Sequence, residues 1–384
     1  MTSRWMPPTR GVSRYAIALG FLGAGSLAQA QMTFERTPWS LTAEGYANLV
    51  AGHSYHEDGG DAGGDSRVDA GLRLLALRSS TSGTTFGVRA EALSSPEDNL
   101  QTGERSVLAF GDWGRLEVGK RQGLPVTITG YAPNYFTFTG AEFSVSSGRG
   151  LDPGGTLATA FLSPSLAARI DAISTLGFAA TLFNDQSGKL IYVAPKTNGW
   201  QFGASYSPDA EDQHGRFTDL TQAGLTREIY TGRNVYKFGG SVAHAQGGRD
   251  PVNNATLRDL NSLNTGFSAT LDDALTLGVA FTYDGESGLA SGPHQTDAHG
   301  VTASANYNTG PWTIGGYAQR ARSEGDPSLP GADVLRVLQF GVSYRISTQI
   351  RFFAATYFYR FDDEGGAAGR FDGTVVLGGV RLTL

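Results

Sequence analysis

Most of the chain is a succession of short stretches in which apolar residues alternate with polar or small ones. Residues 200–207, 275–283 and 301–307 show this most clearly, because an apolar side chain occupies every second position. A period of two is the period of a β-strand, since successive side chains of a strand point to opposite faces. Each predicted strand therefore has one apolar face and one face of small or polar residues.

The connections between the predicted strands have two lengths that alternate along the chain. Short ones include 81–83 and 272–274, and long, acidic, glycine-rich ones include 55–65, 208–227 and 285–298. Bacterial outer-membrane barrels have short turns at one end and long loops at the other, and their apolar strand faces contact lipid. The pattern predicts an all-β fold, a transmembrane antiparallel β-barrel of about sixteen strands. The predicted spans are 40–54, 66–79, 84–95, 104–112, 114–121, 187–195, 200–207, 227–232, 234–245, 261–271, 275–284, 299–308, 312–322, 334–346, 349–361 and 371–384.

One connection, residues 122–186, is far longer than an ordinary loop, and it contains several prolines and a cluster of aromatic residues. A barrel of this size leaves an aqueous channel, because its side chains cannot fill the interior. Loops of such length in a compact domain are usually functional. We therefore expect residues 122–186 to fold into the lumen as a constriction loop that narrows the channel.

The first thirty residues have the features of a secretory signal peptide. Arg4, Arg10 and Arg14 form a positive region, an apolar stretch follows, and Ala28-Gln29-Ala30 fits the small-x-small cleavage pattern. We expect residues 1–30 to be removed, which leaves a barrel domain of residues 31–384. Removal takes the formal net charge from −6 to −9, because the segment holds three arginines and no acidic residue.

The composition excludes several other classes of protein. There is no cysteine, which removes thiolate catalysis and cysteine-bound zinc. No stretch reaches the ~18 consecutive apolar residues of a membrane-spanning helix. The negative net charge argues against a nucleic-acid partner. The six histidines accompany no nucleophile motif, so the sequence predicts a protein that is not an enzyme and needs no cofactor and no metal.

Three segments resemble the general porins of Gram-negative bacteria, a family of trimeric sixteen-stranded outer-membrane barrels. They are Arg105–Gly123 (RSVLAFGDWGRLEVGKRQG), Lys189–Pro208 (KLIYVAPKTNGWQFGASYSP) and the C-terminal VVLGGVRLTL. The family's terminal strand usually ends in Phe, whereas this chain ends in Leu384. The resemblance implies a homotrimer in the cell outer membrane, surrounded by outer-membrane lipid and lipopolysaccharide. It also implies a water-filled channel for passive diffusion of small hydrophilic solutes and ions.

The family's constriction places acidic groups of the third loop opposite arginines of the barrel wall. The resemblance makes Arg105 a wall arginine and places Lys189 close to another, while Arg89 and Glu91 share one strand face and are expected to point into the lumen. Either Arg73 or Arg78 is expected to add a further wall charge. On the loop, the resemblance points to Glu142 and Asp152. The residues expected at the pore constriction are thus Arg89, Glu91, Arg105, Glu142, Asp152 and Lys189.

A substrate-specific channel of the sugar type is the alternative function. Such pores line the lumen with aromatic side chains, which Tyr131, Tyr135 and Phe136 of the long connection could supply. For the general pore, basic and acidic candidates nearly balance at the constriction. The sequence therefore predicts weak ion selectivity and leaves its sign open.

Overall fold

The fold was analysed in a computed structural model of the chain. It describes residues 31–36, 38–56, 64–94, 101–121, 123–124, 161, 187–209, 217–249, 254–287, 297–323, 331–363 and 369–383. Within these residues no helix is long and apolar enough to cross a membrane.

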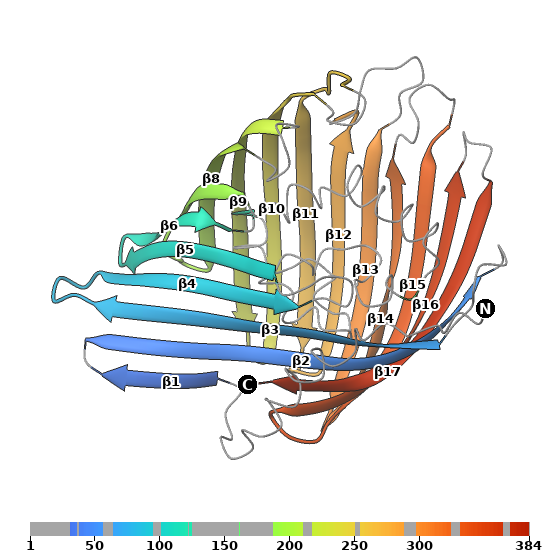
Figure 1. Cartoon of the computed structure of the whole chain (residues 1–384), viewed down its shortest axis with the longest axis horizontal. Coiled ribbons are helices and arrows are strands. Elements are labelled where there is room, and N and C mark those ends of the chain that lie inside the picture. The colour runs from blue at the N-terminus through green and yellow to red at the C-terminus, as the bar shows by residue number, and fades with distance from the viewer. Residues whose placement is uncertain are drawn as a thin grey trace, which may run out of the picture.

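The described residues form seventeen antiparallel strands in one sheet (Figure 1). Each of the strands β2 to β17 pairs with the next along the chain, and β17 pairs with β2, so these sixteen strands close a barrel. The closed sixteen-stranded antiparallel barrel confirms the predicted fold class. The strands are β1 (Gln31–Arg36), β2 (Trp39–His56), β3 (Gly64–Ser79), β4 (Thr85–Ser94), β5 (Gln101–Gly111), β6 (Gly114–Lys120), β7 (Gly188–Val193), β8 (Trp200–Asp209), β9 (Phe217–Thr231), β10 (Asn234–Gly247), β11 (Leu260–Leu271), β12 (Leu275–Gly285), β13 (Ala298–Thr309), β14 (Trp312–Ser323), β15 (Asp333–Arg345), β16 (Ile350–Asp363) and β17 (Arg370–Thr383).

The short strand β1 lies outside the ring of sixteen, and the period of two did not reveal it. It pairs with the first part of β2, from Trp39 to Glu44, while β17 pairs with the second part, from Tyr46 to His56. Strand β2 therefore has a partner on both sides along nearly its whole length. This pairing leaves little open sheet edge where the barrel closes, and open edges are sites of aggregation.

Strand β9 differs most from its prediction, because it begins at Phe217 rather than at residue 227. Its pairing with β10 shifts register between His244 and Gln246, and Asp219 opposite this point has a φ of 54°. An irregularity of this kind breaks the strict alternation of faces. The period of two fails there, and the predicted loop 208–227 is wrong because β9 occupies its second half.

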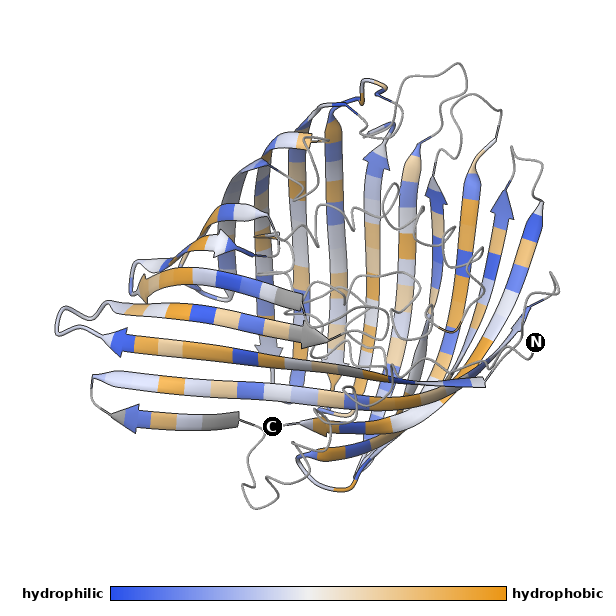
Figure 2. Cartoon of the chain, in the orientation of Figure 1, coloured by the Kyte–Doolittle hydropathy of each residue, from blue (hydrophilic) through white to orange (hydrophobic). Residues whose placement is uncertain are grey.

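The polarity of the barrel is the reverse of that of a soluble protein. Large apolar side chains such as Val107 (59% exposed), Phe238 and Phe340 point outward, whereas polar side chains such as Asn264 and Gln339 (0% exposed) are buried on the inner face. Figure 2 shows the resulting alternation of hydrophobic and hydrophilic residues along the strands. This arrangement suits a barrel with lipid outside and a polar lumen inside.

Tight turns join the strands at one end of the barrel. Asn198 and Gly199 have φ values of 51° and 80°, and Asp272 and Asp273 have 51° and 58°. Two successive residues with positive φ form the primed turns whose twist matches that of a β-hairpin. At Gly199 a Cβ atom would lie 2.2 Å from the Glu228 carbonyl oxygen, so that turn also requires glycine for space.

The inner face of the barrel carries two apolar clusters. The larger one lies on β14 to β17 and β2, and it includes Tyr317, Leu335, Tyr357 and Phe361. The smaller one joins Leu124, Ile191 and Val193. The inner faces of β2 to β6 carry charged side chains instead, and these form the candidate site.

Candidate functional site

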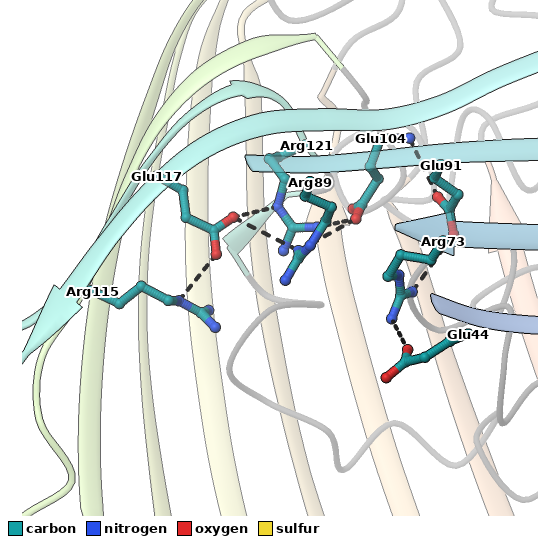
Figure 3. A network of polar contacts seen from close by, with 8 residues as sticks. All are labelled: Glu44, Arg73, Arg89, Glu91, Glu104, Arg115, Glu117 and Arg121. Carbon is teal, nitrogen blue, oxygen red and sulfur yellow. Dashed lines mark hydrogen bonds and ion pairs between the residues drawn. The ribbon is translucent and has the colours of Figure 1, made fainter. Parts of the chain in front are cut away.

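Eight charged side chains form one polar network on the inner wall (Figure 3). They come from neighbouring strands and from the residue that follows β6, and they comprise four arginines and four glutamates. The network consists of Glu44 on β2, Arg73 on β3, Arg89 and Glu91 on β4, Glu104 on β5, Arg115 and Glu117 on β6, and Arg121.

The first part of the network follows directly from strand register. Glu44 lies opposite Arg73, and Arg73 lies opposite Glu91. Arg73 Nη1 is 3.2 Å from Glu44 Oε2, and Arg73 Nη2 is 3.6 Å from Glu91 Oε1. Opposite charges in directly paired positions stabilise a sheet. Arg73 thus links two carboxylates across three strands.

A shift in strand register brings the second part of the network next to the first. The pairing of β4 with β5 shifts between Ala90 and Ala92, with Ala90 opposite Arg105 and Ala92 opposite Thr102. Glu91 faces the displaced backbone there, and the backbone N–H of Glu104 donates to Glu91 Oε2 at 3.3 Å. Such irregularities change the direction of nearby side chains. The shift places the Glu104 carboxylate beside the arginines of the wall.

Two buried carboxylates share two arginines in this second part. The side chains of Glu104 and Glu117 are both 0% exposed. Arg89 Nη1 lies 3.6 Å from Glu104 Oε2 and 3.8 Å from Glu117 Oε2. Arg121 Nε lies 2.6 Å from Glu117 Oε2, and its Nη1 contacts Glu104. Arg115 adds a contact of 3.1 Å between its Nε and Glu117 Oε1.

The network balances its own formal charge. Its four guanidinium groups and four carboxylates cancel when all are ionised, and each member has an opposite charge close by. Removal of one partner from a buried ion pair is strongly destabilising, at about 3–5 kcal/mol, because the other charge is left without compensation. The wall is therefore rich in charge but carries little net charge.

The structure places the predicted site residues on both faces of the barrel. Arg89 and Glu91 point to the inner face within the network. Lys189 is also on the inner face, where it is buried and its Nζ donates to Ser187 Oγ at 2.8 Å. Of the two candidates on β3, Arg73 points inward, while Arg78 points outward and lies 5.2 Å from the ring of Trp39.

The expectation that Arg105 faces the lumen is wrong. Arg105 is exposed on the same face of β5 as Val107, whereas its neighbours Glu104 and Ser106 are buried on the inner face. The alternation of a strand makes the two positions mutually exclusive. The resemblance located the correct strand, and the lumen-facing charge is the adjacent Glu104. Glu142 and Asp152 lie outside the residues that the structure describes.

Sequence reasoning missed five members of the network, which are Glu44, Glu104, Arg115, Glu117 and Arg121. Arg115 and Glu117 carried a usable signal, because they are two positions apart on one strand and so share a face. Glu104 is next to Arg105 on the predicted strand, so alternation places only one of the two in the lumen. Its contact with Glu91 could not be predicted, because the register shift opposite Glu91 is not visible in the pattern of residues.

Leu124 and Phe161 of the long connection contact the inner wall. The backbone N–H of Leu124 donates to Gln222 Oε1 on β9 at 2.9 Å, and its side chain packs against Ile191 and Val193. Phe161 is 6% exposed and belongs to the larger inner cluster. Its ring lies 2.9 Å from the place that a Cβ atom on Gly52 would take. The two contacts lie on different parts of the wall.

Comparison with known sequences gives a family. A profile of Gram-negative porins matches residues 16–364. The chain belongs to the Gram-negative porin family. A comparison with individually curated proteins gives no significant match.

Solved porin structures share the fold of this porin. OmpF of Salmonella typhi, solved with daunomycin, is 11% identical with a TM-score of 0.63, and the match covers 91% of this chain and 100% of OmpF. An anion-selective porin from Comamonas acidovorans is 15% identical with a TM-score of 0.58, covering 90% and 100%. OmpT of Vibrio cholerae in its trimer form is 13% identical with a TM-score of 0.54, covering 88% and 99%.

Family and fold together give the function of the protein. It is an outer-membrane porin that forms a channel for passive diffusion of small hydrophilic solutes. Family and fold point to a channel rather than to an enzyme.

Proposed function

We propose that this porin is a general, weakly selective channel and has no catalytic role. The charge-balanced wall of β2 to β6 is the observation that carries the proposal. Rows of unpaired charge across a narrow pore select ions by sign. Here four guanidinium groups are paired with four carboxylates on the wall itself, so the field that an ion meets is small. Neutral hydrophilic solutes and ions of both signs then pass without strong discrimination.

We propose further that residues 122–186 form the other side of the narrowest region. Leu124 and Phe161 support this, because both are buried against inner faces of the barrel. Arg121, just before this connection, is also tied to the wall by Glu104 and Glu117. In this proposal Glu142 and Asp152 are the acidic groups that face the wall, with Arg89, Glu91 and Lys189 opposite.

The sugar-type alternative has weaker support from the described residues. Tyr357 and Tyr359 stack on the inner face, with ring centroids 6.0 Å apart. Both side chains are nearly fully buried within the apolar cluster, however, so they offer little ring surface to a passing solute. Tyr131, Tyr135 and Phe136, which the alternative requires, lie outside the described residues.

We also propose that the mature protein is a homotrimer of residues 31–384. The positive region of Arg4, Arg10 and Arg14 and the small-x-small pattern at Ala28-Gln29-Ala30 support cleavage after Ala30. The trimer form of Vibrio cholerae OmpT supports the oligomeric state.

Reversal potentials in a salt gradient test the charge balance. The double variant Glu104→Gln/Glu117→Gln leaves the wall arginines in excess and is expected to make the channel more anion-selective. The double variant Arg89→Gln/Arg121→Gln should move the potential in the opposite direction. Arg105→Gln is the matched control, because Arg105 lies on the outer face, and its reversal potential should equal that of the wild type. If both double variants fold and conduct with the wild-type potential, the wall network is not at the narrowest point.

A further inference from the structure

Three arginines form a row on the inner face at the short-turn end of the barrel. Arg345 on β15 lies directly opposite Arg351 on β16, and Arg351 lies directly opposite Arg381 on β17. Arg345 is the last residue of β15, Arg351 is the second of β16, and Arg381 lies two residues before the end of β17 at Thr383. Short turns face the periplasm in outer-membrane barrels. The row therefore lines the periplasmic mouth of the channel.

The alternation of the strands places these side chains toward the lumen. Arg351 lies on the same face of β16 as Phe353, a member of the larger inner cluster. Arg381 is buried on the inner wall, where its guanidinium carbon lies 5.7 Å from the ring centroid of Tyr46. Arg345 is exposed at the edge of the lumen. Directly opposite residues of an antiparallel pair have Cβ atoms about 5 Å apart, so one extended ligand can contact all three guanidinium groups.

The row differs from the charged wall of β2 to β6 in the order of its charges. On that wall, directly opposite positions alternate in sign, from Glu44 to Arg73 to Glu91. On β15 to β17, three cations follow one another without an acidic residue between them. Like charges in directly opposite positions of a sheet repel each other. An anion that bridges the three arginines relieves this repulsion.

The row also has hydrogen-bond donors that a ligand can use. The side chain of Arg345 makes no ion pair or hydrogen bond with any residue that the structure describes. Arg351 and Arg381 have other interactions within the protein, but a guanidinium group has five N–H donors, which a single partner does not use up. The side-chain nitrogen of Gln349, two residues before Arg351, is buried without a hydrogen-bond partner among the described residues. The planar fork of a guanidinium group donates two parallel hydrogen bonds to an oxyanion.

We propose that the arginine row Arg345–Arg351–Arg381 binds multivalent oxyanions, such as short polyphosphates, at the periplasmic mouth. Successive phosphoryl groups lie against successive guanidinium groups, so the ligand extends across β15 to β17. A bound polyanion occupies part of the mouth and reduces the current through the channel. The site goes beyond the channel proposed above, because the charge-balanced wall concerns the passage of small ions, whereas the row recognises clustered negative charge.

Planar-bilayer recordings with tripolyphosphate test the site. Channels are inserted from one compartment so that they share one orientation, and tripolyphosphate is added to one side and then to the other. The wild type should be blocked at a lower concentration from one side, because the row lies at one mouth only. The double variant Arg345→Gln/Arg351→Gln should need at least about tenfold more tripolyphosphate on that side for the same block, since it removes several charge-assisted hydrogen bonds.

Two controls separate a discrete site from the general charge of this end of the barrel. Lys237→Gln removes a cation from the inner face near the short-turn end of β10, where Lys237 Nζ lies 3.3 Å from Glu228 Oε1. Arg78→Gln/Arg227→Gln removes two cations that lie over tryptophan rings on the outer face. Both control variants should be blocked like the wild type.

A single substitution guards against misfolding of the double variant. Arg345 is exposed at the end of β15, and Arg345→Gln breaks no described ion pair. It should weaken the block from the same side by a smaller factor than the double variant does.

Two results would overturn the proposal. One is a folded, conducting Arg345→Gln/Arg351→Gln variant that tripolyphosphate blocks as it blocks the wild type. The other is a Lys237→Gln variant whose block weakens as much as that of the double variant, because the mouth would then act through its overall charge. Conductance in potassium chloride alone reports on the channel, so a channel that conducts without block counts against the arginine row and not against the proposed channel function.

Discussion

Replacement of Arg121 by Met removes the cation that two fully buried carboxylates share. Arg121 contacts Glu104, and its Nε lies 2.6 Å from Glu117 Oε2. At an effective dielectric constant of about 20, two unit charges at that separation attract by roughly 6 kcal/mol. Desolvation offsets part of this attraction, so the expected loss of stability is about 3–5 kcal/mol, the usual cost of leaving one buried partner uncompensated. Arg89 remains near both carboxylates and favours the lower end of the range.

The assay is the temperature at which the folded barrel, purified in detergent, converts to the unfolded form on a gel after a fixed heating time. A loss of this size should lower that temperature by roughly 5–10 °C. The double variant Arg121→Met/Glu104→Gln should recover part of the loss, because it removes a carboxylate together with its cation. This recovery would show coupling between the two residues.

Arg105→Met is the matched control, since it removes an arginine from the same part of the sheet but from the outer face. It should melt close to the wild type. The reasoning is refuted if Arg121→Met melts with the wild type, or if the added Glu104→Gln substitution lowers the melting temperature further instead of restoring it.

Two further predictions concern glycines. Gly52→Leu should displace Phe161 from the inner wall and change single-channel conductance, because a Cβ at that position would lie 2.9 Å from the ring. Ala51→Leu is the control on the outer face and should leave conductance unaltered. Equal conductance of the two variants would contradict the contact between Gly52 and Phe161. Gly199→Val should lower the melting temperature more than Gly232→Val does. Both glycines have a positive φ, but only at Gly199 would the new Cβ atom meet a backbone oxygen. Equal losses of melting temperature would mean that the backbone strain of a positive φ is the whole effect.

The sequence alone determined the architecture of this protein. Alternation in single strands, such as 200–207 and 301–307, and the two lengths of connection are local properties that can be read without knowledge of contacts. They were enough to predict a closed barrel of sixteen strands and an exceptional connection at 122–186. They succeed because a lipid-exposed barrel forces every strand to alternate, and because the turn length depends on the side of the membrane.

Only the tertiary structure decided which charges meet. The prediction placed Arg105 in the lumen, whereas its neighbour Glu104 points there. It also missed the first ten residues of β9, which begins at Phe217 rather than at residue 227. The assignment of Arg105 came from the resemblance, and the regular alternation of β5 places Glu104 rather than Arg105 on the inner face. For β9 a register shift alters the alternation on which the sequence prediction depends. Such a shift depends on the pairing of two strands and leaves no periodic trace in either one.

Three arginines on the outer face of β14, β15 and β16 also become neighbours only through the pairing of strands. Arg320, Arg336 and Arg360 are separated in the chain by turns and loops of unequal length, and only the strand register aligns them. The amino-acid pattern fixes the face on which each side chain lies, whereas the register fixes its neighbours. Register arises from the closure of the whole barrel, so the charged wall becomes visible only once the strands are paired.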